Sequence, residues 1–193
     1  MRDGLVVELG CGSGVLAREL TRAGFDVLGF DASPAMIALA RKHAGNARFE
    51  AGAFDTAEIP PCAAIVAMGE VLNYGTFEGV RNLVATAPTK VLLFDIAERG
   101  AYPAYDESRV EGNDWSVIAI KESDGTHLTR RVLTFRAHGE TMRRTEEIHT
   151  LELYDRAEMN ALLREHGFRV QVRRSYGTLR LPKGHAVYVC VRR

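Results

Sequence analysis

Residues 5–14 read Leu-Val-Val-Glu-Leu-Gly-Cys-Gly-Ser-Gly, an apolar run that ends in three alternate glycines. The apolar part predicts a buried strand. Apolar residues then recur at helical spacing over 15–23, so the glycines occupy the turn between the strand and a helix. Glycine lets the backbone turn sharply and approach a ligand closely, and the free N–H groups at the start of a helix favour an anionic group. The stretch predicts a strand–loop–helix unit built around a ligand.

The alternation of strand and helix continues through the first half of the chain. Further strands are predicted at 25–30, 48–51, 63–68 and 91–95. Between them, Ser33-Pro34 has the pattern of an N-cap followed by proline at the first helical position, and Thr76 can cap a helix that ends before Pro88. This order predicts an α/β, Rossmann-like doubly wound fold with a mostly parallel sheet covered by helices on both faces.

The pattern changes after residue 97. Residues 98–114 look irregular, and three strand-like runs with hairpin turns follow, which predict a small antiparallel β insertion over 115–153. Asp155 and Glu158 then form a capping box that opens a helix. Two strands close the chain, and we expect the last one to be antiparallel.

These patterns predict a single domain over residues 1–193. Its expected parts are a cofactor-binding half at 1–97, the β insertion at 115–153, and a C-terminal helix and strands at 154–193.

The glycine spacing distinguishes between two classes of cofactor. Asp31 ends the second predicted strand about 20 residues after the glycines, where a carboxylate can hold both hydroxyls of a ribose. The dinucleotide fingerprint needs a third small residue at position 15, which is Val15 here. The glycines fall instead at 10, 12 and 14, with Glu8 before them. The pattern favours S-adenosylmethionine (SAM). An NAD(P)-dependent Rossmann oxidoreductase and a non-catalytic SAM-binding module remain alternatives.

Residues 5–95 resemble the class I SAM-dependent methyltransferases. Residues 6–14 look like the first motif of that family, and residues 30–36, Phe-Asp-Ala-Ser-Pro-Ala-Met, look like the second. The resemblance implies that the backbone of the glycine loop contacts the methionine moiety and that Asp31 holds the ribose. The expected cofactor-binding residues are Glu8, Gly10, Cys11, Gly12, Gly14, Asp31, Ala32, Met36, Ala53, Phe54 and Met68.

The third motif departs from the family pattern. It reads Gly52-Ala53-Phe54 where the family usually has an aspartate after the glycine. Ala53 cannot accept a hydrogen bond from the adenine amino group, so Asp55 or a backbone carbonyl would have to do so. Phe54 contributes either to the cofactor site or to the core.

Candidate catalytic residues follow the fourth predicted strand and lie in the second half. Residues 67–74, Ala-Met-Gly-Glu-Val-Leu-Asn-Tyr, would by resemblance line the space between the sulfonium and the acceptor. Glu70 is expected to contact the substrate or the ammonium group of SAM, and Tyr102 and His149 are the other candidates for a base. A base is needed only if the attacking atom must lose a proton. A strand's register determines which face His149 occupies, and sequence alone does not define it.

The charge composition of the chain indicates which kinds of molecule it binds. The formal net charge is zero, whereas nucleic-acid binders usually carry a basic excess, so we expect a small-molecule substrate and no nucleic acid. The β insertion resembles the acceptor platform of small-molecule N- and O-methyltransferases.

The remaining sequence features concern metals, location and assembly. Three cysteines without metal-ligand spacing predict reduced thiols in a cytoplasmic protein with no metal site, and no apolar run is long enough to predict a membrane span. Only four residues precede Leu5, where family members carry helices that cover the cofactor. Either the chain is truncated, or the cover comes from elsewhere; for the second case we hypothesise that residues 98–114 or the partner in a homodimer cover the site.

Overall fold

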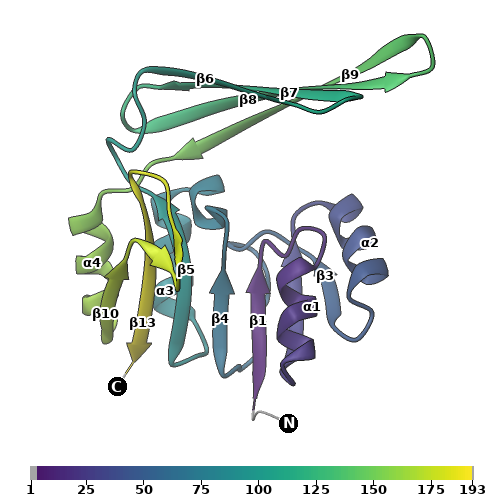
Figure 1. Cartoon of the computed structure of the whole chain (residues 1–193). Helices are drawn as coiled ribbons and strands as arrows, with labels where there is room; N and C mark the ends of the chain where they lie inside the picture. The colour runs from purple at the N-terminus through teal and green to yellow at the C-terminus, as the bar shows by residue number, and fades with distance from the viewer. Residues whose placement is uncertain (1–3, 193) are drawn as a thin grey trace.

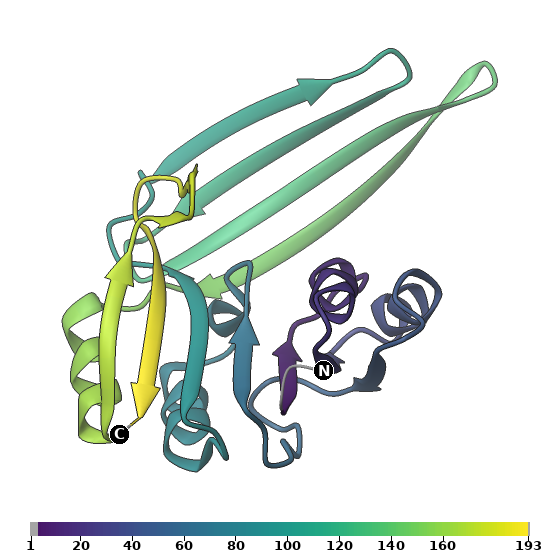
Figure 2. The same ribbon diagram turned by 60° about the horizontal axis from the view of Figure 1, so that its bottom comes forward.

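The computed structural model describes residues 4–192, and its centre is a seven-stranded sheet (Figures 1 and 2). The strand order is β10-β13-β5-β4-β1-β2-β3. The strands are β1 (Leu5–Leu9), β2 (Asp26–Asp31), β3 (Arg48–Ala51), β4 (Ala64–Ala67), β5 (Val91–Ala97), β10 (Phe168–Arg173) and β13 (His185–Arg192). Strands β1 to β5 are parallel, and β13 runs antiparallel to both β5 and β10. This confirms the predicted mostly parallel sheet with an antiparallel last strand.

Helices cover both faces of this sheet. They are α1 (Val15–Arg22), α2 (Pro34–His43), α3 (Phe77–Thr86) and α4 (Arg156–Glu165), with a 3₁₀ turn, η1, at Val71–Tyr74. Neighbouring residues of a strand point to opposite faces. Accordingly Val27 packs in a core with α1 and α2, whereas Leu28 packs in a core with α3 and α4. The doubly wound arrangement follows from these two cores.

The predicted caps begin three of the helices. The side-chain oxygen of Ser33 accepts from the N–H of Met36 at 3.4 Å, and that of Thr76 accepts from Gly79 at 3.1 Å. Asp155 accepts from the N–H groups of Ala157 and Glu158. Each cap satisfies a backbone donor that the helix leaves unpaired.

A second, four-stranded antiparallel sheet lies beyond the carboxyl edge of the main sheet (Figure 1). Its strands are β6 (Tyr105–Glu111), β7 (Trp115–Ser123), β8 (His127–His138) and β9 (Thr141–Glu152). The three expected strands are present, but the expectation that 98–114 is irregular is wrong, because it contains β6. This edge strand is almost entirely exposed and its polar residues do not alternate with apolar ones, so it lacks the period-2 signal that marks a half-buried strand.

Buried contacts attach the second sheet to the domain. Leu128, Leu151 and Leu153 pack with Ala97 in a third apolar cluster. Asn73, fully buried, donates to the carbonyl oxygens of Ala97 at 2.9 Å and Glu152 at 2.6 Å, and its side-chain oxygen accepts from the N–H of Ala97 at 2.9 Å. The base of the sheet is therefore held against η1 and β5.

A short hairpin that the sequence patterns did not indicate precedes β13. It consists of β11 (Ser175–Tyr176) and β12 (Leu179–Arg180). The Tyr176 hydroxyl lies 3.5 Å from the sulfur of Met68, just after β4. The hairpin thus lies near the carboxyl edge of the main sheet.

Candidate functional site

The glycine loop has the backbone conformation that its composition predicts. Gly10, Gly12 and Gly14 have φ angles of 66°, 53° and 80°, in the left-handed region that favours glycine. A Cβ atom on Gly10 would lie 2.3 Å from the side chain of Val71 in η1. The loop after β1 can therefore approach the segment after β4 only because Gly10 has no side chain.

Asp31, at the end of β2, bridges the two loops that follow β1 and β2. One carboxylate oxygen accepts from the N–H of Gly12 at 2.8 Å, and the other accepts from the N–H of Ser33 at 2.9 Å. Each carboxylate oxygen can accept a second hydrogen bond. The carboxylate is therefore oriented by the backbone and still has capacity for two hydroxyl groups.

A cavity of about 730 Å³ opens at this edge of the sheet. Predicted cofactor residues that line it are Gly10, Asp31, Ala32, Met36, Ala53, Phe54 and Met68. Asp55 also lines it, as required of a residue that would replace the missing aspartate of the third motif. The ring of Phe54 is buried and would lie 2.5 Å from a Cβ atom on Gly75. Phe54 therefore serves both the core and the cavity wall.

The other predicted cofactor residues, Glu8, Cys11, Gly12 and Gly14, are not among the lining residues. Burial raises the pKa of Glu8 to about 7, against a backbone hydrogen bond from Ala17, and the nearby charge of Asp31 raises it further. One Glu8 oxygen has no hydrogen-bond partner within residues 4–192. Burial, followed by the charges of Glu8 and Asp31, raises the pKa of Cys11 to about 12. Glu8 and Cys11 are thus buried beneath the loop surface rather than exposed in the cavity.

His149 and Tyr74 form the other wall of the cavity. Both line it, and the Tyr74 hydroxyl lies 3.1 Å from Nδ1 of His149. The Nε2 atom of His149 lies 3.5 Å from a carboxylate oxygen of Glu147. The register of β9 therefore places His149 on the cavity side, and it contributes an imidazole to a site otherwise formed by the first half of the chain.

Glu70 and Tyr102, the other catalytic candidates, do not line the cavity. The carboxylate of Glu70 accepts hydrogen bonds from Arg130 at 2.6 Å and from Tyr102 at 3.3 Å, and it also contacts Nε2 of His185. Burial raises the pKa of Glu70, but the hydrogen bond with His185 and the charge of Arg130 outweigh burial and hold the pKa at about 2. Burial and the charge of Glu70 raise the pKa of Tyr102 to about 12. Glu70 is a buried, ion-paired carboxylate and a very weak base.

Sequence reasoning missed Arg130 and His185, the partners of Glu70. They lie 60 and 115 residues away along the chain, and no local motif connects them with Glu70. Opposing effects act on the pKa of His185. Burial lowers it, and the hydrogen bond and charge of Glu70 more than compensate, so the pKa is raised. The positive form of His185 is therefore favoured beside the carboxylate.

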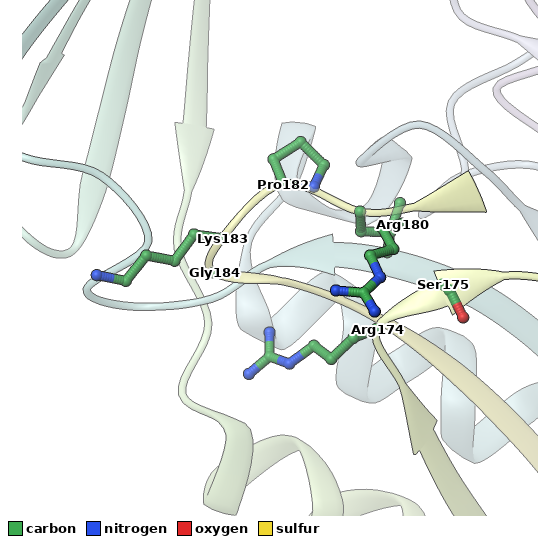
Figure 3. A pocket seen from close by; sticks show the side chains of 7 residues that line it. Arg174, Ser175, Arg180, Pro182, Lys183 and Gly184 are labelled. Carbon is green, nitrogen blue, oxygen red and sulfur yellow. The ribbon is translucent and has the colours of Figure 1, made fainter. Parts of the chain in front are cut away.

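Figure 3 shows a second cavity, of about 560 Å³, formed by residues 174–184 before β13. Arg174 in its wall pairs with Glu98 at 3.2 Å and donates to the carbonyl oxygen of His185 at 2.6 Å. This cavity contains none of the predicted site residues.

Within the described chain, no group of three or more His, Cys, Asp or Glu side chains is placed to hold a metal ion. No described helix has the length and apolar character needed to cross a membrane.

The known proteins that this chain resembles are methyltransferases. Residues 6–92 match the family described as methyltransferase domain. The mitochondrial ubiquinone biosynthesis O-methyltransferase of Schizosaccharomyces pombe is 34% identical over 76 residues, which cover 36% of this chain and 28% of that protein. The match thus spans little more than a quarter of the length of this relative.

Solved structures share the whole fold at low sequence identity. A SAM-dependent methyltransferase from Clostridium acetobutylicum superposes with a TM-score of 0.84 at 15% identity, over 97% of this chain and 83% of that one. An amino pentose methyltransferase from Micromonospora echinaspora, involved in calicheamicin biosynthesis, has a TM-score of 0.79 at 21% identity, over 98% and 83%. Residues 6–92 therefore match the methyltransferase-domain family, and the whole chain has the fold of solved SAM-dependent methyltransferases.

Proposed function

We propose that this protein transfers the methyl group of SAM to a nitrogen or oxygen atom of a small-molecule acceptor. The proposal depends on one observation: a single cavity joins the glycine loop and Asp31 to Tyr74 and His149. The first pair would hold the cofactor, and the second would face the acceptor.

The residues present fit SAM. Bound SAM supplies a methyl group on a sulfonium, from which the neutral thioether departs as a good leaving group. The Asp31 carboxylate, already oriented by Gly12 and Ser33, would hold the ribose hydroxyls. The adenine of SAM would enter an apolar part of the cavity, which is lined by Met36, Ala53 and Phe54. The protein then needs mainly to position the acceptor for in-line attack, which can lower a barrier by up to ~7–11 kcal/mol.

The relatives support a nitrogen or oxygen acceptor. One is named as an amino pentose methyltransferase and another as an O-methyltransferase. An amine or hydroxyl must lose a proton during methylation, and His149 is the imidazole that lines the cavity. His149 is therefore the candidate base: with Nδ1–H donating to Tyr74, Nε2 would accept the proton, and Glu147, 3.5 Å from Nε2, would stabilise the imidazolium. A base adds ~10²–10⁴-fold to the rate.

Calorimetry with S-adenosylhomocysteine (SAH) and NAD tests the cofactor. We expect SAH to bind and NAD not to bind. NAD binding without SAH binding would overturn the proposal in favour of an oxidoreductase. A screen with radiolabelled SAM against amino sugars, phenols and simple amines then tests transfer, and SAH binding without transfer to any of them would favour a non-catalytic module.

The variant His149→Gln separates binding from chemistry. We expect SAH affinity within about twofold of the wild type and a rate loss of ~10²-fold or more on any accepted substrate. His138→Gln, on the exposed end of β8, is the control and should leave both unchanged.

We also propose that the protein forms a homodimer through the outer face of the second sheet. The register of β7, β8 and β9 places five apolar side chains on that face: Ile118, Ile120, Leu133, Phe135 and Ile148. Ile148 is 61% exposed, and the other four side chains are half-buried. Apolar side chains gathered on one face of a sheet favour a protein–protein contact there.

The charges at the edges of this face favour a second copy as the partner. In one row across the sheet, Arg109 on β6 and Glu146 on β9 flank Ile118 and Leu133. A two-fold axis parallel to the strands would place β6 over β9 of the other subunit, because such an axis exchanges the two edges. Arg109 would then face Glu146 of the partner subunit, and the apolar centres would meet.

Light scattering after gel filtration tests the dimer. We expect a dimeric mass for the wild type at micromolar concentration and a monomeric mass for Leu133→Glu. Leu39→Glu, at an exposed position on α2, is the matched control and should remain dimeric. A monomeric wild type would overturn the proposal.

A cytoplasmic location is a further proposal. It is supported by three free cysteines, two of them buried. Free thiols of this kind persist in a reducing compartment.

A further inference from the structure

Glu70 connects parts of the protein that are far apart in the sequence. Its carboxylate contacts Arg130 on β8, Tyr102 between β5 and β6, and His185 at the start of β13. It is 9% exposed as a residue, and the side chain of Arg130 is 23% exposed. Removing one partner from such a pair leaves a poorly solvated charge, so the arrangement resists opening.

The backbone at Glu70 is also constrained. Glu70 has a φ angle of 61°, the only positive φ among the non-glycine residues that the structure describes. A non-glycine residue keeps this conformation only when its surroundings impose it. The neighbouring Asp95 carboxylate accepts from the N–H of Gly69 at 2.6 Å and approaches that of Glu70 at 3.4 Å. Gly69 and Val71, on either side, line the cavity.

Arg130 connects this constrained segment to the wall that carries His149. Arg130 and His149 are direct cross-strand partners on β8 and β9, and side chains at such positions lie on the same face of a sheet. The ion pair between Glu70 and Arg130 therefore lies beside the hydrogen bond between Tyr74 and His149. Tyr74 belongs to η1, which begins immediately after Glu70.

We propose that Glu70 and Arg130 are positioning residues whose ion pair fixes the second sheet over the cavity and thereby places His149 against Tyr74. His185 and Tyr102 hold the Glu70 carboxylate in the orientation that Arg130 requires. The inference rests on the proposed function, because the proposed function makes His149 the base and so makes its position matter for methyl transfer. It replaces the expectation that Glu70 itself contacts the substrate.

Hydrogen–deuterium exchange of the full-length protein with and without SAH tests this role. Arg130→Met removes the charge but keeps a long side chain. We expect amides of β8 and β9 near Arg130 and His149 to exchange roughly tenfold faster or more, the change expected from losing one charge-assisted hydrogen bond. Amides of β1 to β4 and the affinity for SAH should stay within about twofold.

Arg131→Met is the matched control. Arg131 is the next residue and lies on the outer face of the second sheet, beside Ile120 and Ile148. Among the described residues, its ion pair is a long contact of 3.5 Å with Glu146. Arg131→Met should leave exchange near His149 unchanged. Equal exchange in the two variants would overturn the proposal. If Arg130→Met does not fold, Glu70→Gln replaces it and should accelerate exchange in the same strands; unchanged exchange in that variant would also overturn the proposal.

The imidazole ¹⁵N signals of His149 provide a readout that a purely structural role would not change. We expect the Nδ1 signal to move toward that of an unbonded imidazole in Arg130→Met, and to be largely restored in Arg130→Lys, which keeps the charge. An unmoved signal would overturn the proposal. If the wild type fails to bind SAH while these effects appear, the proposed function is wrong and the positioning role still holds.

Discussion

Asp31 has two backbone partners even without a ligand, and this determines how its substitution should act. The N–H groups of Gly12 and Ser33 both donate to its carboxylate. The carboxylate therefore organises two loops of the cavity as well as offering acceptors to a ribose. Loss of Asp31 removes both contributions together.

Asp31→Ala should weaken SAH binding by about 1–3 kcal/mol, because hydrogen-bonding groups of the ligand and of the loops lose their partner. Isothermal calorimetry measures this loss directly. Asp26→Ala at the other end of β2 is the control: Asp26 pairs with Arg48 at 3.0 Å on the surface, so we expect its affinity to stay near that of the wild type. Unchanged affinity in Asp31→Ala would remove this residue from the cofactor site.

Glu8 should give the protein a measurable pH dependence. Its folded-state pKa is raised to about 7 from an ordinary 4.5, so the folded protein binds this proton more tightly than the unfolded chain. Stability is therefore favoured by the protonated form and decreases as pH rises from about 4.5 through 7. Glu8→Gln should remove up to about 1.4 kcal/mol per pH unit of this slope.

Urea denaturation at several pH values between 5 and 8 measures the slope. Glu58→Gln, at an exposed carboxylate, should keep the slope of the wild type. Parallel curves for Glu8→Gln and the wild type would show that burial does not shift the Glu8 proton equilibrium.

The 3₁₀ turn η1 connects the main sheet with the second sheet. Asn73 in this turn uses both ends of its amide to hold β5 and β9. Tyr74, the next residue, reaches His149. The second sheet is thus held in part by one turn of helix that also forms part of the cavity wall.

Asn73→Ala should reduce the free energy of unfolding by about 2–4 kcal/mol, because it removes the acceptor of the buried Ala97 N–H and the amide donor to the carbonyl oxygens of Ala97 and Glu152. Denaturation in urea measures this loss. Asn82→Ala, on the exposed side of α3, should change stability by less than ~0.5 kcal/mol. A similarly small loss in Asn73→Ala would mean that water replaces the missing amide.

Local signals account for the elements that were predicted correctly. The glycine loop and the caps at Ser33, Thr76 and Asp155 each depend on residues within a few positions of one another. Strand β6 was missed because edge strands with two polar faces lack periodicity. The surroundings of Glu70 were missed because they depend on contacts 60 and 115 residues apart, which no short pattern encodes.

At the scale of the whole molecule, two sheets meet around one cavity. The first half of the chain supplies the glycine loop, Asp31 and the apolar part of the cavity, and the second sheet supplies His149. Ligand binding should therefore stabilise the whole domain rather than one loop.

SAH at 100 times its Kd should stabilise the folded protein by roughly 2.7 kcal/mol, by mass action alone. For a chain of this size, this corresponds to a rise in Tm of about 5–11 °C. Differential scanning fluorimetry measures the rise, with NAD at the same concentration as the control. Equal shifts with NAD and SAH would contradict selective binding.

The antiparallel direction of β13 has a practical consequence. Because β1 starts and β13 finishes at the edge of the main sheet away from the second sheet (Figure 1), a tether joined to the chain next to β1 or β13 begins on the side opposite the crevice. The domain can therefore be captured on a sensor chip or bead from that side with its entrance facing the flowing solution.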